Sequence, residues 1–214
     1  MTERKNYSGG KIMKSNIKII AGDKMKEKEN LVWYFNRNPH MLITGTTATG
    51  KTYLLKRMAD YLSQVGIVSA SFDKTEFEEI LSSSRKEMED RFEYIKENRF
   101  KMFDVSYSDL DMKPYFVLID ELDSRLLLLE KENPLAYNYL LLIIKDIVLK
   151  GRAVGVFFIA VRQGKQPFLE SIEDNMLTRI FLGNSKGNGT ICFDGNTKKF
   201  QTELVTEDFF SVDC

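Results

Sequence analysis

One stretch of this sequence combines residue types that bind phosphate groups. Residues 45–52 read Gly-Thr-Thr-Ala-Thr-Gly-Lys-Thr, in which two glycines with four residues between them precede a lysine and a threonine. Without a Cβ, Gly45 and Gly50 allow successive main-chain N–H groups to curl around a phosphate. Placed between a strand and a helix, this pattern predicts a phosphate-binding P-loop.

The residues within and after this loop predict ATP and Mg2+ as its ligands. Lys51 is expected to reach the β- and γ-phosphates, and the Thr52 hydroxyl to ligate the Mg2+ that bridges them. The positive N-terminal end of the following helix favours the same anions. The predicted cradle is completed by the residues between the glycines, which are Thr46, Thr47, Ala48 and Thr49. The alternative is a Gly-Thr surface turn before a helix.

A pair of acidic residues predicts the hydrolytic half of the site. Residues 115–119 are apolar and predict a buried strand, so Asp120 lies at its carboxyl end, where a Mg2+-associated carboxylate belongs. Glu121 beside it can orient and deprotonate a water for attack on the γ-phosphate, which favours hydrolysis over transfer to an acceptor hydroxyl. The alternative is an acidic pair that caps the start of a helix.

The surrounding segments predict the elements that position these residues. Residues 41–44, which are apolar or β-branched, predict the strand before the loop, and the spacing of apolar residues in 52–62 predicts the helix after it. Strands alternating with helices predict an α/β fold with a mostly parallel sheet covered on both faces. A second buried strand is expected at 67–72, and further strands at 156–160 and 178–182. Helices are expected at 74–103, 134–150 and 167–173.

The N-terminal and C-terminal segments do not follow the alternation of strands and helices. Residues 1–38 form a polar leader with one short strand expected at 17–21, and residues 39–214 form the ATPase domain. Residues 1–40 carry an excess of five positive charges, which can contact DNA phosphates or anionic lipid, or can simply be solvated. The C-terminal part predicts a β-hairpin of 190–193 with 200–204.

The composition predicts a protein with one core, and predicts neither a membrane span nor a disulfide scaffold. With 214 residues and 43% hydrophobic content, the chain can bury one sizeable core, and its zero net charge gives no global field for nucleic acid. Cys192 and Cys214 lack metal-type spacing and indicate a reduced, cytoplasmic chain. Lys145 and Asp146 interrupt the most apolar run, 135–149, so neither a membrane span nor a secretion signal is predicted.

Several stretches together resemble the motor domain of the FtsK/SpoIIIE family of DNA translocases. The resemblance spans about residues 38–194, and four motifs in the correct order are more specific than any one of them. The motifs are 38–43 with the start of the P-loop, 87–92, 113–122 and 151–155.

This resemblance implies a RecA-like P-loop NTPase fold, with the strand 156–160 between the P-loop strand and the acidic strand. It also implies a hexameric ring around double-stranded DNA, with one active site at each subunit interface. The chain lacks the family's membrane segment, long linker and C-terminal reading domain. A short form from a plasmid, phage or conjugative element, serving membrane-associated conjugation or division machinery, fits this compactness, and so does a fragment of a larger protein.

By the same resemblance, Arg152 is the first candidate for an arginine finger that reaches a neighbour's γ-phosphate, and Arg179 is the second. A surface salt bridge is the alternative for either. After the strand 156–160 the family usually has Ala-Thr-Gln-Arg-Pro, whereas residues 160–164 read Ala-Val-Arg-Gln-Gly. Either Gln163 senses the γ-phosphate by a one-residue shift, or Arg162 contacts phosphate directly, or coupling is altered.

Candidate DNA contacts are basic residues in predicted loops. These are Lys165, Lys186 and Arg125, which would bind phosphates independently of sequence, or would only be solvated. His40 also matches a family position, but we interpret it as a structural residue rather than a catalyst.

Three functions remain at this point. The first is an ATP-driven motor on double-stranded DNA, which the ordered motifs favour. The second is a P-loop ATPase that drives protein secretion or assembly without binding DNA, which the zero net charge favours. The third is a nucleotide-binding regulatory subunit without productive hydrolysis, which the altered residues 162–163 favour.

Overall fold

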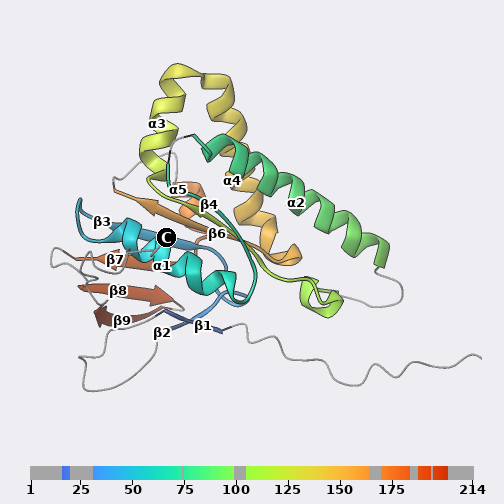
Figure 1. Cartoon of the computed structure of the whole chain (residues 1–214), viewed down its shortest axis with the longest axis horizontal. Coiled ribbons are helices and arrows are strands. Elements are labelled where there is room, and N and C mark those ends of the chain that lie inside the picture. Colours follow the sequence, from blue (N-terminus) through green and yellow to red (C-terminus); the bar gives the residue numbers. More distant parts are fainter. Residues whose placement is uncertain are drawn as a thin grey trace, which may run out of the picture.

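A seven-stranded, mostly parallel sheet forms the centre of the molecule (Figure 1). The computed structural model describes residues 16–19, 31–73, 75–98, 105–163, 170–183, 188–193 and 195–201. The strand order is β4-β5-β6-β3-β7-β8-β9. The strands are β3 (Met41–Gly45), β4 (Ile67–Ser71), β5 (Tyr115–Ile119), β6 (Val156–Arg162), β7 (Thr178–Leu182), β8 (Asn188–Phe193) and β9 (Asn196–Gln201).

The central strands confirm the predicted α/β architecture. Every residue of β5 and β6 is buried, so both faces of these strands are covered. β6 lies between β3 and β5 and is parallel to both, as the resemblance implied. Since the carboxyl ends of parallel strands share one edge, the segments that follow β3, β5 and β6 meet there.

The edges of the sheet differ from the expectation in detail. Residues 67–72 were expected to form a buried strand, but β4 is an edge strand and Ile67 is 45% exposed. The predicted C-terminal hairpin is present as β8 and β9, which pair antiparallel, but β9 begins at Asn196 rather than at the predicted residue 200. β8 also pairs antiparallel with β7. The part of the prediction beyond residue 201 lies outside the described residues.

The predicted helices are present at or close to the expected ranges, and the described residues contain one further α-helix that was not predicted. α1 (Lys51–Ser63) follows the P-loop, α2 (Phe77–Asn98) is one long helix, and α4 (Pro134–Lys150) leads through the 3-10 turn η2 (Gly151–Val154) into β6. α5 (Glu170–Glu173) precedes β7, and the 3-10 turn η1 (Tyr107–Leu110) precedes β5. The unpredicted helix is α3 (Leu122–Glu132), which begins directly after the acidic pair.

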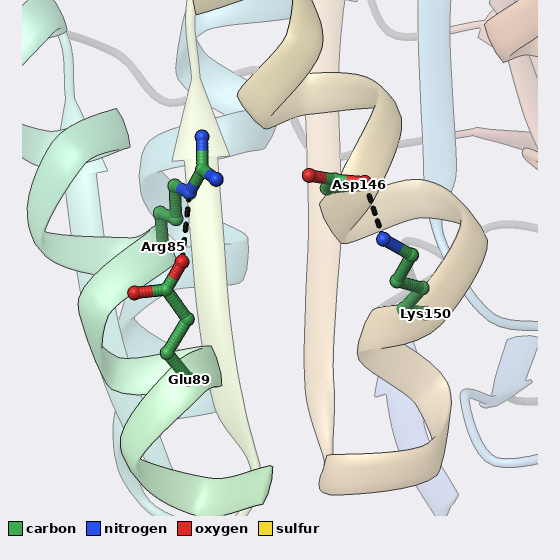
Figure 2. A network of polar contacts seen from close by, with 4 residues as sticks. All are labelled: Arg85, Glu89, Asp146 and Lys150. Carbon is green, nitrogen blue, oxygen red and sulfur yellow. Dashed lines mark hydrogen bonds and ion pairs between the residues drawn. The ribbon is translucent and has the colours of Figure 1, made fainter.

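Helices α2 and α4 pack side by side next to the sheet (Figure 2). Each carries an ion pair along its own axis, Arg85 with Glu89 at 2.9 Å and Lys150 with Asp146 at 2.7 Å. Pairs of this spacing on exposed helix surfaces contribute only about 0.3–0.5 kcal/mol each. The apolar inner face of α4, which includes Leu140, is what holds this helix against the protein.

The segment before the P-loop strand contributes to the core. β1 (Asn16–Ile19) and β2 (Leu31–Tyr34) form an antiparallel ribbon, close to the strand expected at 17–21. Trp33 and Phe35 are 1% and 3% exposed, and their rings lie against Phe116. Residues 33–38, which we had assigned to the leader, therefore include core side chains.

Buried polar groups connect several elements at the amino-terminal ends of the parallel strands, which we call the amino edge of the sheet. Arg91 of α2 donates to the carbonyl oxygens of Lys113 at 2.9 Å and Val154 at 3.1 Å. These two residues belong to the segments that lead into β5 and β6. Arg91 also pairs with Glu87 at 2.7 Å. His40, fully buried, accepts a hydrogen bond at Nδ1 from the main-chain N–H of Phe158 at 2.9 Å. These contacts are structural, which agrees with our interpretation of His40.

Candidate nucleotide-binding and hydrolytic site

The P-loop connects β3 to α1 at the carboxyl edge of the sheet. Gly50 has φ 92° and Ala48 has φ 60°, both left-handed, and Gly50 has open space around its missing Cβ. Gly45 is required for another reason, because a Cβ there would lie 2.7 Å from the main-chain oxygen of Leu182 in β7. The first glycine thus lets the loop pass the neighbouring strand, and the second sets the turn into the helix.

Lys51 is held over this loop. Its Nζ donates to the main-chain oxygen of Thr46 at 2.6 Å, and the Thr49 hydroxyl donates to the same oxygen at 2.8 Å. Burial lowers the pKa of Lys51, and three nearby carboxylates oppose this change. These carboxylates are Asp120, Asp123 and Glu121.

The acidic pair lies at the carboxyl end of β5, as predicted. Asp120 is 3% exposed, its main-chain N–H donates to Ser71 in β4 at 3.0 Å, and its Oδ1 accepts from the main-chain N–H of Glu121 at 3.0 Å. Glu121 begins α3 with φ 50°. A left-handed non-glycine residue stores strain, and such strain is concentrated at functional sites. Glu121 is half-buried, and its charge acts on Lys51, whose pKa it helps to raise.

The residue after β6 joins this edge. Gln163 Oε1 accepts a hydrogen bond from the Thr47 hydroxyl at 3.3 Å, and the Gln163 main-chain N–H donates to Asp123 Oδ2 at 3.1 Å. Arg162, the last residue of β6, is buried and forms an ion pair with Glu173 of α5. Of the two candidate sensors, Gln163 has a side-chain hydrogen bond to the P-loop residue Thr47, and Arg162 pairs with Glu173.

A cavity of about 330 Å³ opens beside the start of the P-loop. Gly45, Thr46, Gln163 and Arg179 are among its lining residues. Arg179 donates to the main-chain oxygen of Glu173 at 3.1 Å, and its side chain is 52% exposed. The cavity therefore lies next to the predicted phosphate cradle, and both polar and apolar side chains line it.

This arrangement fits ATP chemistry, since a glycine-turned loop, a buried lysine and a carboxylate pair converge on one edge. Residues 41–180 match the model of the ATPase family associated with various cellular activities (AAA). The chain belongs to the AAA family. It is therefore an AAA-type ATPase.

One comparison agrees with the predicted resemblance to FtsK-like proteins, and a second shows a shared fold. The chain is 27% identical over 194 residues to the FtsK domain-containing protein YdcQ of Bacillus subtilis (strain 168), covering 80% of this chain and 40% of that protein. It superposes on the conjugation coupling protein TcpA of pCW3, solved with ATPγS, with a TM-score of 0.71 at 16% identity, covering 90% of this chain and 66% of TcpA. The chain thus spans less than two thirds of either relative.

The chain also shares its fold with a secretion ATPase. The cytoplasmic domain of the type VII secretion ATPase EccC of Thermomonospora curvata matches with a TM-score of 0.62 at 14% identity, covering 90% of this chain and 26% of EccC. These structural likenesses support the RecA-like P-loop ATPase fold. Within the described residues, the structure contains no helix of sufficient length and apolar character to span a membrane.

The structure describes two of the remaining candidate residues, Arg152 and Arg125, and leaves the other two outside the described chain. Arg152 is exposed in η2, which precedes β6 and therefore lies at the amino edge, opposite the P-loop. The prediction that Arg125 lies in a loop is wrong, because it lies in α3, is 5% exposed and donates to the Ser71 hydroxyl. In this structure its guanidinium faces protein rather than solvent. Lys165 and Lys186 lie outside the described residues.

Asp123 is the site residue that sequence reasoning missed. It lies in the first turn of α3, three residues after Asp120, and is 4% exposed. A third carboxylate three residues after Asp120 could have been noticed in the sequence 120–123. Without a prediction of α3, that spacing had no meaning.

Proposed function

We propose that this AAA ATPase uses ATP hydrolysis to move double-stranded DNA, as a hexameric ring with active sites at subunit interfaces. The observation that carries the proposal is the split between the two edges of the sheet. The P-loop, the acidic pair and Gln163 meet at the carboxyl edge, whereas exposed Arg152 lies at the amino edge. An arginine so placed can serve a neighbour's site but not its own.

In this proposal each residue has one role. Main-chain N–H groups of the P-loop bind the phosphates, and Lys51 stabilises the charge that develops on the γ-phosphate. Thr52 and Asp120 would hold Mg2+, which neutralises phosphate charge when it is bound. Glu121 accepts a proton from the attacking water, and Gln163 senses the γ-phosphate.

The first experiment measures ATP hydrolysis with and without linear duplex DNA. We expect DNA to raise turnover several-fold in the wild type, and Lys51→Ala and Glu121→Gln to remove turnover while Glu121→Gln still binds ATP. Turnover that ignores DNA would overturn the translocase proposal and leave the ATPase chemistry intact.

A mixing experiment tests whether neighbouring subunits complete each other's sites. Arg152→Ala and Lys51→Ala are each expected to be inactive, and their mixture to regain part of the wild-type turnover. In the mixture, some interfaces join an intact P-loop to an intact arginine. Lys150→Ala, which removes an exposed lysine two residues away, is the matched control and should remain active. A mixture no more active than its components would contradict the shared site.

Protein secretion or assembly is the second candidate function. Two observations favour it: the fold is shared with the EccC secretion ATPase, and Arg125 is not an exposed DNA contact. Under this alternative, turnover responds to a polypeptide partner and is indifferent to duplex DNA. A cytoplasmic location and association with membrane-bound conjugation or division machinery belong to the proposal in either case.

A further inference from the structure

A hydrogen-bonded chain links α3 to the P-loop through Gln163. Asp123 Oδ2 accepts from the main-chain N–H of Gln163 at 3.1 Å, and the Gln163 side-chain oxygen accepts from the Thr47 hydroxyl at 3.3 Å. The three residues come from α3, the end of β6 and the P-loop. They therefore connect the element that carries the acidic pair to the loop that binds phosphate.

Gln163 needs such an anchor. It follows Arg162, the last residue of β6, so the strand no longer holds its main chain. Its side chain is exposed, and an exposed glutamine loses rotamer freedom when it is held in one position. A hydrogen bond from its N–H to a buried carboxylate fixes the start of the side chain, and this restricts where the amide can point.

The buried position of Asp123 needs a compensating interaction. A carboxylate that is 4% exposed is costly unless hydrogen bonds and opposite charges surround it. The Gln163 N–H supplies a hydrogen bond, and Lys51 supplies a nearby positive charge. Asp123 could thus act through its hydrogen bond to Gln163 or through its charge on Lys51, and the two roles predict different variants.

We propose that Asp123 is a positioning residue that holds the main chain of Gln163, so that the Gln163 amide beside Thr47 meets the γ-phosphate. The proposal rests on the function proposed above, in which Gln163 senses the γ-phosphate. Arg162 lines the same cavity, but its guanidinium is buried and already paired with Glu173. The hydrogen bond to Asp123 makes Gln163 the functional replacement for the family glutamine one position earlier.

The test compares equilibrium affinities for ATPγS and ADP, which differ at the γ-phosphate. Gln163→Ala is expected to lower the preference for ATPγS about tenfold, the loss expected for one hydrogen bond to a charged group. Asp123→Glu keeps the charge but displaces the acceptor, and should lower the preference by the same factor. Asp123→Asn loses the charge but keeps an acceptor oxygen, and should keep the preference within about twofold.

A double variant and a control complete the experiment. Asp123→Glu combined with Gln163→Ala should be no worse than Gln163→Ala alone, because both break one link. Asp109→Ala is the matched control, since Asp109 also accepts a main-chain N–H, from Ser106 at 2.9 Å, far from the P-loop in sequence. The Asp109→Ala variant should prefer ATPγS over ADP by the same factor as the wild type. Melting temperatures show whether each variant is folded.

The opposite pattern would overturn the proposal. If Asp123→Asn loses the preference and Asp123→Glu keeps it, Asp123 acts through its charge on Lys51. If the double variant falls by the product of the two single losses, Asp123 does not act through Gln163. The binding measurement uses neither DNA nor turnover, so a wild type whose hydrolysis ignores DNA would overturn the motor proposal and leave this test readable.

Discussion

Two buried cations, one from each edge of the central sheet, have different sets of partners. At the amino edge, Arg91 is 4% exposed and meets two main-chain oxygens and one carboxylate. At the carboxyl edge, Lys51 is 5% exposed and donates to one main-chain oxygen, that of Thr46. Arg91 is fixed by permanent partners, whereas Lys51 has a partner it can exchange for phosphate. The difference separates a residue that holds the fold from one that performs chemistry.

The largest expected effect is on stability, at the amino edge. Arg91→Ala removes a buried cation that joins α2 to the loops before β5 and β6, and leaves the oxygens of Lys113 and Val154 unpaired. We expect a loss of about 3–5 kcal/mol in the free energy of unfolding, measured by urea denaturation. ATP hydrolysis per folded molecule should change little.

The matched control is on the same helix. Arg85 forms an ion pair of the same spacing, with Glu89 at 2.9 Å, but that pair is partly exposed (Figure 2). Arg85 also lies over the ring of Tyr139. Arg85→Ala should cost about 1 kcal/mol or less. If both variants lose the same stability, the buried contacts of Arg91 do not hold the amino edge together.

The second effect is on activity, at the carboxyl edge. Lys51→Ala should lower ATP hydrolysis by about 10²–10³-fold, because a positive charge aimed at the developing phosphate charge is lost. Its free energy of unfolding should fall by about 1 kcal/mol or less, since the side chain makes one main-chain hydrogen bond. Lys56→Ala, an exposed lysine in the next turn of α1, is the control and should keep its activity. A Lys51 variant that hydrolyses ATP normally would remove the distinction between the edges.

The third effect concerns packing at the amino edge. Gly155 has φ 74°, and a Cβ there would lie 2.5 Å from the ring of Tyr107, which η1 carries. Gly155→Ala should cost about 2–4 kcal/mol, from left-handed strain and overpacking together. Gly195→Ala separates the two causes, because Gly195 has φ 72° and nothing within 4 Å. It should cost about 1–2 kcal/mol. Equal losses at both glycines would mean that Tyr107 moves aside.

The two edges also differ in how much of them the sequence predicts. The strands β3, β5 and β6 were located within one or two residues, because buried parallel strands are continuous apolar runs. The residues directly after them, from the P-loop to Asp120, follow from local motifs. The partners of Arg91 lie up to 63 residues away, and no local pattern predicts them.

The errors have physical causes as well. The sequence 126–129 is four consecutive leucines, which has no helical period, so α3 was missed and Arg125 was placed in a loop. β4 has the composition of a buried strand, but its position at the sheet edge depends on the order of the other strands. The contact between Asp123 and Gln163 spans 40 residues and two elements, one of which was not predicted.

The smallest effect is a dependence of stability on pH, again at the amino edge. Burial lowers the pKa of His40 from 6.5 to about 3, and its neutral Nδ1 accepts from the Phe158 N–H. The unfolded chain therefore binds a proton near pH 6.5 that the folded chain does not bind until about pH 3. This contribution is fully present above the unfolded pKa and is lost as the pH falls through that window. Between about pH 7 and pH 5.5, the free energy of unfolding should fall by about 1 kcal/mol.

An asparagine at the same position isolates this titration. His40 has φ 62°, a conformation that asparagine tolerates, and an asparagine Oδ1 can accept from the same N–H. His40→Asn should be less stable than the wild type at neutral pH, because it fills less of the buried site, but should lose less stability on acidification. Urea denaturation at the two pH values measures the difference. The N–H of Phe158 lies in β6, and Gln163 directly follows the other end of this strand. An equal pH dependence in both proteins would mean that His40 is protonated without disturbing β6, and that the amino edge is less rigid than its contacts indicate.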